Sequence, residues 1–251
     1  MNGFYHLEQM RALGVKPDAG LIYARRAHLL PLTVADVGQA VCDFPVLISR
    51  NSQDGSLMLS ALTSFVPGHN LLADARGWHA VYRPLIVQAY PCYCVNNAGR
   101  PEFVFAMDDS VVTTASHPLV DATGTFSAEA QCLMQNAQAV YDKERQTFLC
   151  LQQLQALQLL QAIELQLQPE HGELQRIRGL MTINEDQLHS LDGASLKALQ
   201  QAGALQLAQS MLTSLLQLNR LIQQHNQQAA SLGVSRIQKL KIEIDRDSGF
   251  L

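Results

Sequence analysis

The segment from Asn70 to Cys94, NLLADARGWHAVYRPLIVQAYPCYC, is the stretch around which this chain is organised. It holds the single tryptophan and three of the six tyrosines. Large aromatic side chains with a polar group favour positions where an apolar core meets a polar neighbour or a ligand. We therefore expect a binding surface formed by five residues: Asn70, Trp78, Tyr82, Arg83 and Tyr90. Such a set suits a sugar, a peptide or a partner side chain equally. The alternative is that the aromatic residues belong to the core, at the seam between a sheet and helices.

The sequence around this segment predicts β-hairpins, because turn-forming residues separate β-prone runs. One hairpin is expected from residues 45–49 and 56–62, and a second from residues 85–95 and 102–107. Within the segment, residues 74–77 predict a tight turn that places Trp78 on a strand. Because proline cannot donate a hydrogen bond to a sheet, Pro84 and Pro91 are expected at strand ends, at an edge or in bulges.

Shorter elements complete the first half of the chain. Residues 21–23 and 111–114 predict short strands. Thr33 and Asp36 have the spacing of a capping box, in which the hydroxyl and the carboxylate satisfy free amides at a helix start. A short helix should follow as far as about Val41.

Near Phe126 the composition shifts to leucine, alanine and glutamine, and the second half is expected to be mainly helical. Ser127 should cap a helix from Ala128 to about Gln168, although residues 163–168 also alternate as a strand would. The other predictions are a strand at 176–183, a short helix capped by Asn184, a long helix at about 195–225, and an alternating segment at 239–245 that either pairs on an exposed sheet edge or stays loose.

Together these elements predict an α+β fold, in which an antiparallel, β-rich N-terminal half packs against long Gln- and Leu-rich helices of the C-terminal half. We expect a single domain over residues 1–232, β-rich at 20–125 and helical at 126–232. A charged C-terminal tail at 233–251 should follow it. The chain has 251 residues, 47% of them hydrophobic, which is ample for a core.

Charge and composition exclude several classes of partner and location. The net charge is −4 and no basic patch is visible, so nucleic acid is not expected. The N-terminus lacks the basic start and apolar run of a secretory signal, which favours a cytoplasmic protein. Residues 198–219 carry no charge, but their many glutamines and hydroxyl residues exclude a membrane span. Five widely spread cysteines argue against a disulfide framework.

No motif assigns a catalytic mechanism. Nucleophile elbows and glycine-rich phosphate loops are absent. Four histidines of the first half each stand without a second histidine at metal-binding spacing: His28, His69, His79 and His117. Cys92 and Cys94 would share one face of a strand, but no second pair stands at zinc-site spacing. We therefore expect no metal and no cofactor.

The same residues resemble the landmarks of the bacterial SapC-like proteins, a family labelled after a surface-layer-associated protein. The matching motifs, in order, are 31–33 (PLT), 43–48 (DFPVLI), 70–78 (NLLADARGW), 82–91 (YRPLIVQAYP), 107–109 (MDD), 118–124 (PLVDATG), 203–207 (GALQL) and 212–215 (LTSL). The resemblance spans about residues 20 to 225. It departs where the family has Arg-Arg before Tyr-Pro, since Gln88 and Ala89 stand there, and where it has Phe after them, since Cys92 stands there. An anionic contact made by those arginines would be lost in this chain.

The resemblance implies a link to surface-layer or nutrient-uptake systems and supplies no catalytic residues. Our leading hypothesis is a non-catalytic binding or assembly factor that engages a protein partner or a small ligand through the Trp78 and Tyr90 region. The alternative is an enzyme, or an enzyme subunit, that modifies a peptide or carbohydrate with His69 or His79 and a nearby carboxylate. The helix predicted at 195–225 has two apolar ridges, so a homodimer through the C-terminal helices is a further expectation.

Overall fold

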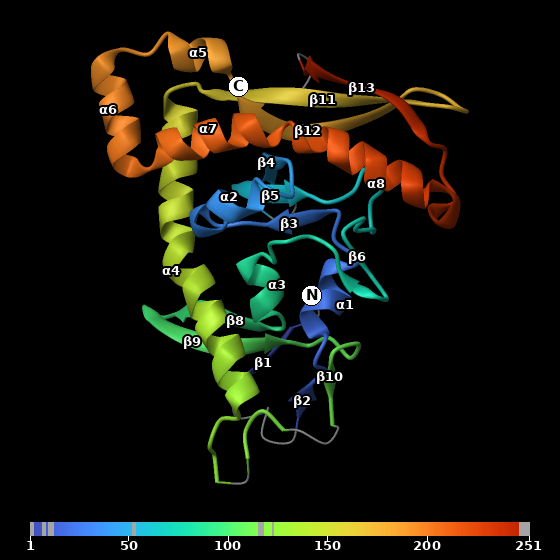
Figure 1. Ribbon diagram of the computed structural model, residues 1–251. Coiled ribbons are helices and arrows are strands. Elements are labelled where there is room, and N and C mark those ends of the chain that lie inside the picture. The colour runs from blue at the N-terminus through green and yellow to red at the C-terminus, as the bar shows by residue number, and fades with distance from the viewer. Residues whose placement is uncertain are drawn as a thin grey trace.

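The structure is a computed structural model that describes residues 3–6, 9, 13–51, 54–114, 118–121 and 123–245. Figure 1 shows a six-stranded sheet at one end of the molecule and a three-stranded sheet toward the other, with one long helix, α4, running past both. Helix α4 spans Ala128–Ala156. Its 29 residues extend about 44 Å at a rise of about 1.5 Å per residue. It therefore contacts elements from both ends of the molecule.

The larger sheet is antiparallel throughout and combines strands from both halves of the chain. Its order is β13-β11-β12-β4-β5-β3. The strands are β3 (Leu29–Pro31), β4 (Val46–Arg50), β5 (Leu57–Leu62), β11 (Leu160–Pro169), β12 (Gln175–Ile183) and β13 (Ile237–Ile244). The halves meet where Met181 of β12 pairs with Ile48 of β4.

Smaller antiparallel pairs lie within and around the Asn70–Cys94 segment. Strands β8 and β9 form a hairpin that β1 extends, β2 pairs with β10, and β6 pairs with β7. Their bounds are β1 (Phe4–His6), β2 (Gly14–Val15), β6 (Ala73–Asp74), β7 (Gly77–Trp78), β8 (Cys92–Asn97), β9 (Arg100–Ala106) and β10 (Val112–Thr113).

The shorter helices lie between and over the sheets (Figure 1). Their bounds are α1 (Ala19–Ala24), α2 (Val34–Ala40), α3 (Leu85–Ala89), α5 (Glu185–His189), α6 (Gly193–Ala202), α7 (Ala204–Ser214) and α8 (Gln217–Leu232). Helices α2, α3 and α7 all contact α4. Helix α4 is therefore the element against which both halves of the chain pack.

Buried apolar side chains form three clusters, which we name by their place in Figure 1. Alternate residues of β4 point to opposite faces of the sheet, and both faces are buried. Val46 and Ile48 join a central cluster with α2, α4 and α7, whereas Leu47 joins an upper cluster with α8. A lower cluster, which contains Phe105 and Tyr90, packs against the first turns of α4.

The structure confirms the α+β fold class and the short-range predictions that rest on turns and caps. The first hairpin is β4–β5, and the tight turn before Trp78 joins β6 to β7. The capping box at Thr33 precedes α2. The Ser127 side chain accepts a hydrogen bond from the backbone of Ala130, and Asn184 caps α5 in the same way. The strand predicted at 176–183 is β12.

Two short apolar runs are helical where strands were predicted. Residues 21–23 lie in α1 and residues 85–89 in α3, so only β8 remains of the predicted strand at 85–95. Runs of three to five apolar residues fit the period of a helix or of a strand. The packing of α1 on α3 decides between them. It is so close at Gly20 that an added Cβ would lie 2.0 Å from the Val87 carbonyl oxygen.

Neither of the two predicted long helices is continuous over its predicted range. The helix that begins at Ala128 ends at Ala156, Gln158 adopts a positive φ of 55°, and β11 follows. The alternation at residues 163–168 was therefore the correct signal. The helix predicted at 195–225 is divided into α6, α7 and α8, and the first break is at Gly203, whose φ of 77° lies in the left-handed region.

The apolar ridges of that predicted helix are buried to different extents. Leu207, Met211 and Leu218 are core residues, as their spacing predicts. In the second ridge, Leu205 and Leu212 pack against the central cluster, but Leu216 is 69% exposed. The break between α7 and α8 turns Leu216 away from the core.

The alternating segment near the C-terminus pairs rather than remaining loose. It forms β13, an edge strand of the six-stranded sheet. Within the residues that the structure describes, no helix combines the length and the apolar character needed to cross a membrane.

Candidate functional site

Trp78, Tyr82 and Arg83 come together in the structure. The Trp78 Nε1–H donates a hydrogen bond to the Tyr82 carbonyl oxygen at 2.9 Å. The Trp78 ring packs against Phe44, with ring centroids 6.2 Å apart. The Arg83 guanidinium lies 5.9 Å from the Trp78 ring centroid, within range of a cation–π interaction. Trp78 and Tyr82 are half-buried and Arg83 is exposed.

Asn70 connects α1 to the start of the Asn70–Cys94 segment through hydrogen bonds of its side-chain amide. It is buried, and its Nδ2 donates to the Ala24 carbonyl oxygen at 2.9 Å. Its Oδ1 accepts the Leu72 N–H at 2.8 Å. Both ends of the amide are therefore used within the chain.

Tyr90 belongs to the lower cluster. Its ring stacks on Tyr23 with centroids 4.5 Å apart, and its hydroxyl donates to Asp108 Oδ2 at 2.6 Å. Burial, and then this hydrogen bond, raises the pKa of Tyr90. Trp78 packs against the neighbouring central cluster, and Tyr23 contacts both clusters.

The residue that connects this region is Asp36, which the sequence marks only as part of a helix cap. Asp36 is 1% exposed. Its Oδ2 accepts the backbone N–H and the hydroxyl of Thr33, each at 2.7 Å. Its Oδ1 accepts the Tyr82 hydroxyl at 2.7 Å and the Leu85 N–H at 2.8 Å. Four donors thus satisfy a buried carboxylate, and Asp36 fixes the start of α2 to the start of α3.

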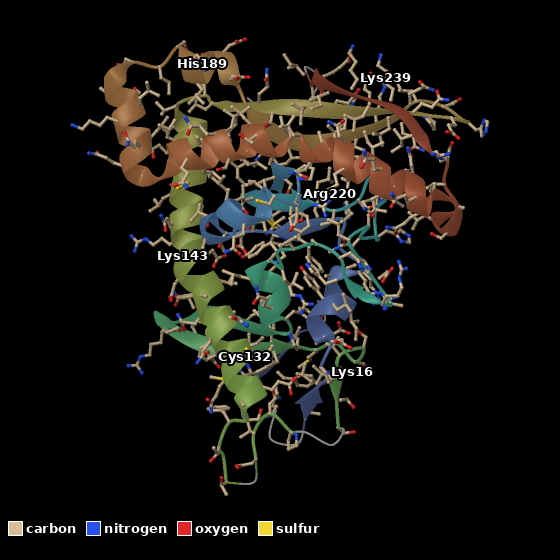
Figure 2. All side chains as sticks on the ribbon, viewed as in Figure 1. Lys16, Cys132, Lys143, His189, Arg220 and Lys239 are labelled. Carbon is tan, nitrogen blue, oxygen red and sulfur yellow. The ribbon has the colours of Figure 1, made fainter. Side chains whose placement is uncertain are left out.

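A second buried carboxylate, Asp43, extends this connection to the C-terminal helices. Its Oδ2 accepts the Tyr82 N–H at 2.7 Å, and its Oδ1 accepts Nη1 of Arg220 at 2.8 Å. Arg220 is labelled on α8 in Figure 2. No sequence pattern relates these positions, because they are far apart along the chain. Only the capping-box spacing drew attention to Asp36.

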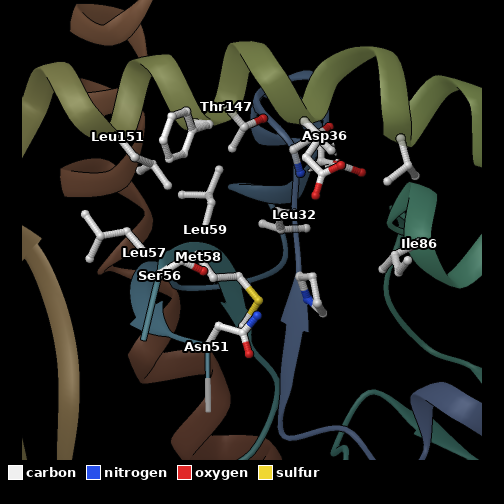
Figure 3. A pocket seen from close by; sticks show the side chains of 15 residues that line it. Leu32, Asp36, Asn51, Ser56, Leu57, Met58, Leu59, Ile86, Thr147 and Leu151 are labelled. Atoms are coloured by element: carbon white, nitrogen blue, oxygen red, sulfur yellow. Dashed lines mark hydrogen bonds between the residues drawn. The ribbon is translucent and has the colours of Figure 1, made fainter. Parts of the chain in front are cut away.

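A cavity of about 220 Å³ lies next to Asp36, between α4, β3 and the β4–β5 hairpin. Figure 3 shows Thr147 and Leu151 on α4 above it, with Met58 on the other side. Most of the lining is apolar. Asp36 already has four donors, and the Thr147 hydroxyl accepts from Val34 and donates to Lys143.

A second cavity of about 430 Å³ continues along α4 toward β8, where Ala89, Cys92 and Cys94 line it. The two cavities have four lining residues in common: Pro31, Ile86, Val140 and Glu144. We call the two together the α4 groove. Glu144 is exposed and adds a carboxylate to the otherwise apolar shared part. None of the five predicted binding residues lines either cavity.

One of the two histidines in the enzyme hypothesis has a carboxylate partner. His79 Nε2 lies 2.8 Å from Asp74 Oδ1. The hydrogen bond from Arg76, and then the one from His79, holds the pKa of Asp74 well below its usual range. This pair lies on the β6–β7 hairpin, outside the α4 groove, and His69 is exposed.

Among the described residues, no three histidine, cysteine, aspartate or glutamate side chains gather closely enough to hold a metal ion. His117 lies outside the described residues. Cys92 and Cys94 do share the hairpin strand β8, and both line the α4 groove.

The five cysteines should differ in reactivity. Cys42 and Cys132 are exposed, whereas Cys92 and Cys150 are buried; Figure 2 shows Cys132 near the lower end of α4. Burial, and then the neighbouring Cys94, raises the pKa of Cys92 to about 12. Because the thiolate is the reactive form, we expect a disulfide reagent at about pH 8 to modify Cys42 and Cys132 quickly and Cys92 only after unfolding. Peptide mapping by mass spectrometry checks this, and rapid labelling of Cys92 in the folded protein would contradict it.

A family model described as SapC matches residues 6–221. Neither the curated proteins nor the solved structures yield a match. The matched range includes α1 to α7, and with them every described residue that lines the α4 groove.

Proposed function

The chain belongs to the SapC family, and we propose that it is a non-catalytic binding protein whose ligand site is the α4 groove. The observation that carries this proposal is that cavities of about 220 and 430 Å³ adjoin along one helix and have four lining residues in common. Ligand-binding clefts typically enclose about 300–1,000 Å³, with mostly apolar walls and a few polar groups that orient the ligand.

Two of the predicted binding residues, Trp78 and Tyr82, stabilise one wall of this site without lining it. Tyr82 bonds to Asp36, and Asp36 in turn accepts the first backbone N–H of α3. Ile86 and Ala89 of α3 line the groove. The Trp78–Tyr82 turn thereby positions one wall of the groove. A direct contact of the ligand with Trp78 or Arg83, at the exposed rim of that turn, stays a prediction.

The lining indicates the chemistry of the ligand. An apolar group fits the walls, and a cation or a hydrogen-bond donor suits the Glu144 carboxylate at the shared part of the groove. A side chain of a partner protein and a small molecule both offer this combination. We place this ligand in a surface-layer or nutrient-uptake system, a part of the proposal that rests on the family label.

A second candidate is an enzyme that uses His79 with Asp74. The 2.8 Å contact between them favours it, because a carboxylate that orients an imidazole is the usual support of a general base. The hairpin that carries the pair lines neither cavity of the α4 groove, so the binding protein is the better-supported function.

Blocking the groove tests the proposal. Val140 lies where the two cavities meet, so Val140→Trp should fill the shared part and weaken binding of the apolar dye Nile red by about tenfold. Leu149→Trp is the matched control, since Leu149 is on the same helix, is 52% exposed and lines neither cavity. Fluorescence titration measures both affinities. Equal affinities for the two variants would contradict the proposed site.

The same titration tests the role of Glu144. Decylammonium should displace the dye at lower concentration than decanoate, because the cation pairs with the Glu144 carboxylate in a partly apolar setting. In Glu144→Gln this difference should disappear while Nile red affinity remains. A difference that persists in Glu144→Gln would show that another group selects the ligand charge.

A further inference from the structure

Strand β13 leaves one long edge of the six-stranded sheet open. It pairs with β11 on one side, and no described strand pairs with its other side. The opposite edge of the sheet is the short strand β3, which ends in Pro31 and therefore lacks one donor. β13 has eight residues, Ile237–Ile244, and contains no proline. An open strand of this length is a template for pairing with another chain.

The backbone of β13 presents alternate residues to that open edge. The Asp245 N–H donates to the Ala162 carbonyl oxygen at 3.0 Å, so this residue faces β11. Counting back by twos, residues 243, 241 and 239 also direct their backbone groups to β11. Leu240, Ile242 and Ile244 therefore direct their N–H and C=O groups outward.

The side chains of these three residues form an incomplete apolar row. They stand opposite Leu167, Leu165 and Ile163 of β11, all of which are buried in the upper cluster. On β13 the exposed fraction of these side chains rises toward the C-terminal end, where Ile242 is 38% exposed and Ile244 is 54% exposed. A strand added at this edge would continue the row and cover both isoleucines.

The polar face of β13 carries charges of both signs. Lys239 and Lys241 come first along the strand and Glu243 follows. If two copies pair antiparallel about a two-fold axis at Ile242, Lys241 of each copy stands opposite Glu243 of the other, and Leu240 stands opposite Ile244. If the two-fold axis lay at Lys241 instead, the Lys241 side chains of the two copies would stand opposite each other, which is unfavourable.

We propose that β13 is a homodimer interface: two copies pair antiparallel about Ile242 and join their six-stranded sheets into one continuous sheet. The occupant of the edge is a second copy because the charge pattern of β13 complements itself in this register. The symmetry is that of an isologous dimer, in which the same patch serves both subunits. This interface uses the C-terminal strand, in contrast to the dimer through the C-terminal helices that the sequence suggests. Figure 2 shows Lys239 at the end of the molecule that carries the six-stranded sheet.

Charge exchange tests both the interface and its register. Full-length wild type should sediment as a dimer at about 100 μM, where an association with a Kd of about 10 μM is largely complete. Lys241→Glu and Glu243→Lys should each be monomeric, because like charges then face each other across the axis. Mixed in equal amounts, the two variants should form a one-to-one heterodimer, since each glutamate of the first meets a lysine of the second. Native mass spectrometry distinguishes this heterodimer by mass.

Controls separate this result from a general effect of charge. Lys197→Glu makes the same change at an exposed position of α6 and should leave the dimer intact. In hydrogen exchange, the amides of Ile242 and Ile244 should be protected at least tenfold more in the dimer than in the monomeric variants. A monomeric wild type would overturn the proposal. So would a dimer that persists in Lys241→Glu, or one in which these amides remain unprotected.

Discussion

Replacement of Asp36 by alanine should lower the free energy of unfolding by about 4 kcal/mol, because four buried or part-buried donors then lose their shared acceptor at once. The Thr33 N–H, the Tyr82 hydroxyl and the Leu85 N–H all donate to this carboxylate. Water entering the cavity beside Asp36 in the variant should replace some of these bonds and keep the loss below the sum of the separate bonds. Urea denaturation, followed by the fluorescence of the single tryptophan and by circular dichroism, measures the change.

A control variant removes an aspartate near a helix start that makes no such network. Asp18 is the N-cap residue of α1, but its side chain makes no capping hydrogen bond and is exposed, whereas Asp36 lies in the first turn of α2. Asp18→Ala should therefore change stability by less than about 0.5 kcal/mol. Tyr82→Phe removes one donor to Asp36 and should cost about 1 kcal/mol. If Asp36→Ala costs no more than Tyr82→Phe, the carboxylate does not hold this region together.

Replacement of Gly20 by alanine should destabilise the protein by about 2 kcal/mol, although the same change in an exposed helix usually stabilises by about 1 kcal/mol. The alanine Cβ would lie 2.0 Å from the Val87 carbonyl oxygen, far inside contact distance. That oxygen is backbone, so α1 or α3 must move to relieve the clash. The first amide of α3 and the Tyr82 hydroxyl both bond to Asp36, and Tyr82 accepts the hydrogen bond of the Trp78 indole. A movement of α3 should therefore also change the tryptophan fluorescence of the folded state.

Gly38→Ala is the internal comparison for this experiment. Gly38 lies inside α2, and a Cβ there would meet no atom within 4 Å. This variant should be as stable as wild type, or more stable by up to about 1 kcal/mol, because alanine favours the helix. Denaturation of the two variants side by side gives the contrast. Equal stabilisation by both substitutions would show that α1 and α3 are not in close contact.

The sequence predicted the elements whose signals are local. The capping box at Thr33 and Asp36, the cap at Ser127 and the turn before Trp78 were all correct, since each is satisfied by groups a few residues apart. Predictions failed where the signal was a short apolar run, as at residues 21–23. They also failed where a helical composition continued past the true end of α4.

None of the five predicted binding residues lines the α4 groove, and a role for them in binding stays a prediction. The aromatic segment lies beside the α4 groove. The polar groups of Asn70, Tyr82 and Tyr90, however, form hydrogen bonds within the chain. The groove residue Glu144 had no signal at all, because an exposed glutamate on a long helix resembles any other. The role of Asp36 as a four-donor acceptor was equally hidden, since two of its donors come from residues 46 and 49 positions away.

The sequence by itself determined the fold class, the caps and turns, and family membership. These depend on residue type and spacing within a few turns of the chain, where local hydrogen bonds and side-chain period suffice. Only the tertiary structure decided that α1 and α3 are helices, that Asp36 and Asp43 tie the central segment to α2 and α8, and that a groove opens along α4. Each of these depends on which surfaces meet in space, and the free energy of such contacts belongs to pairs of residues that are distant along the chain.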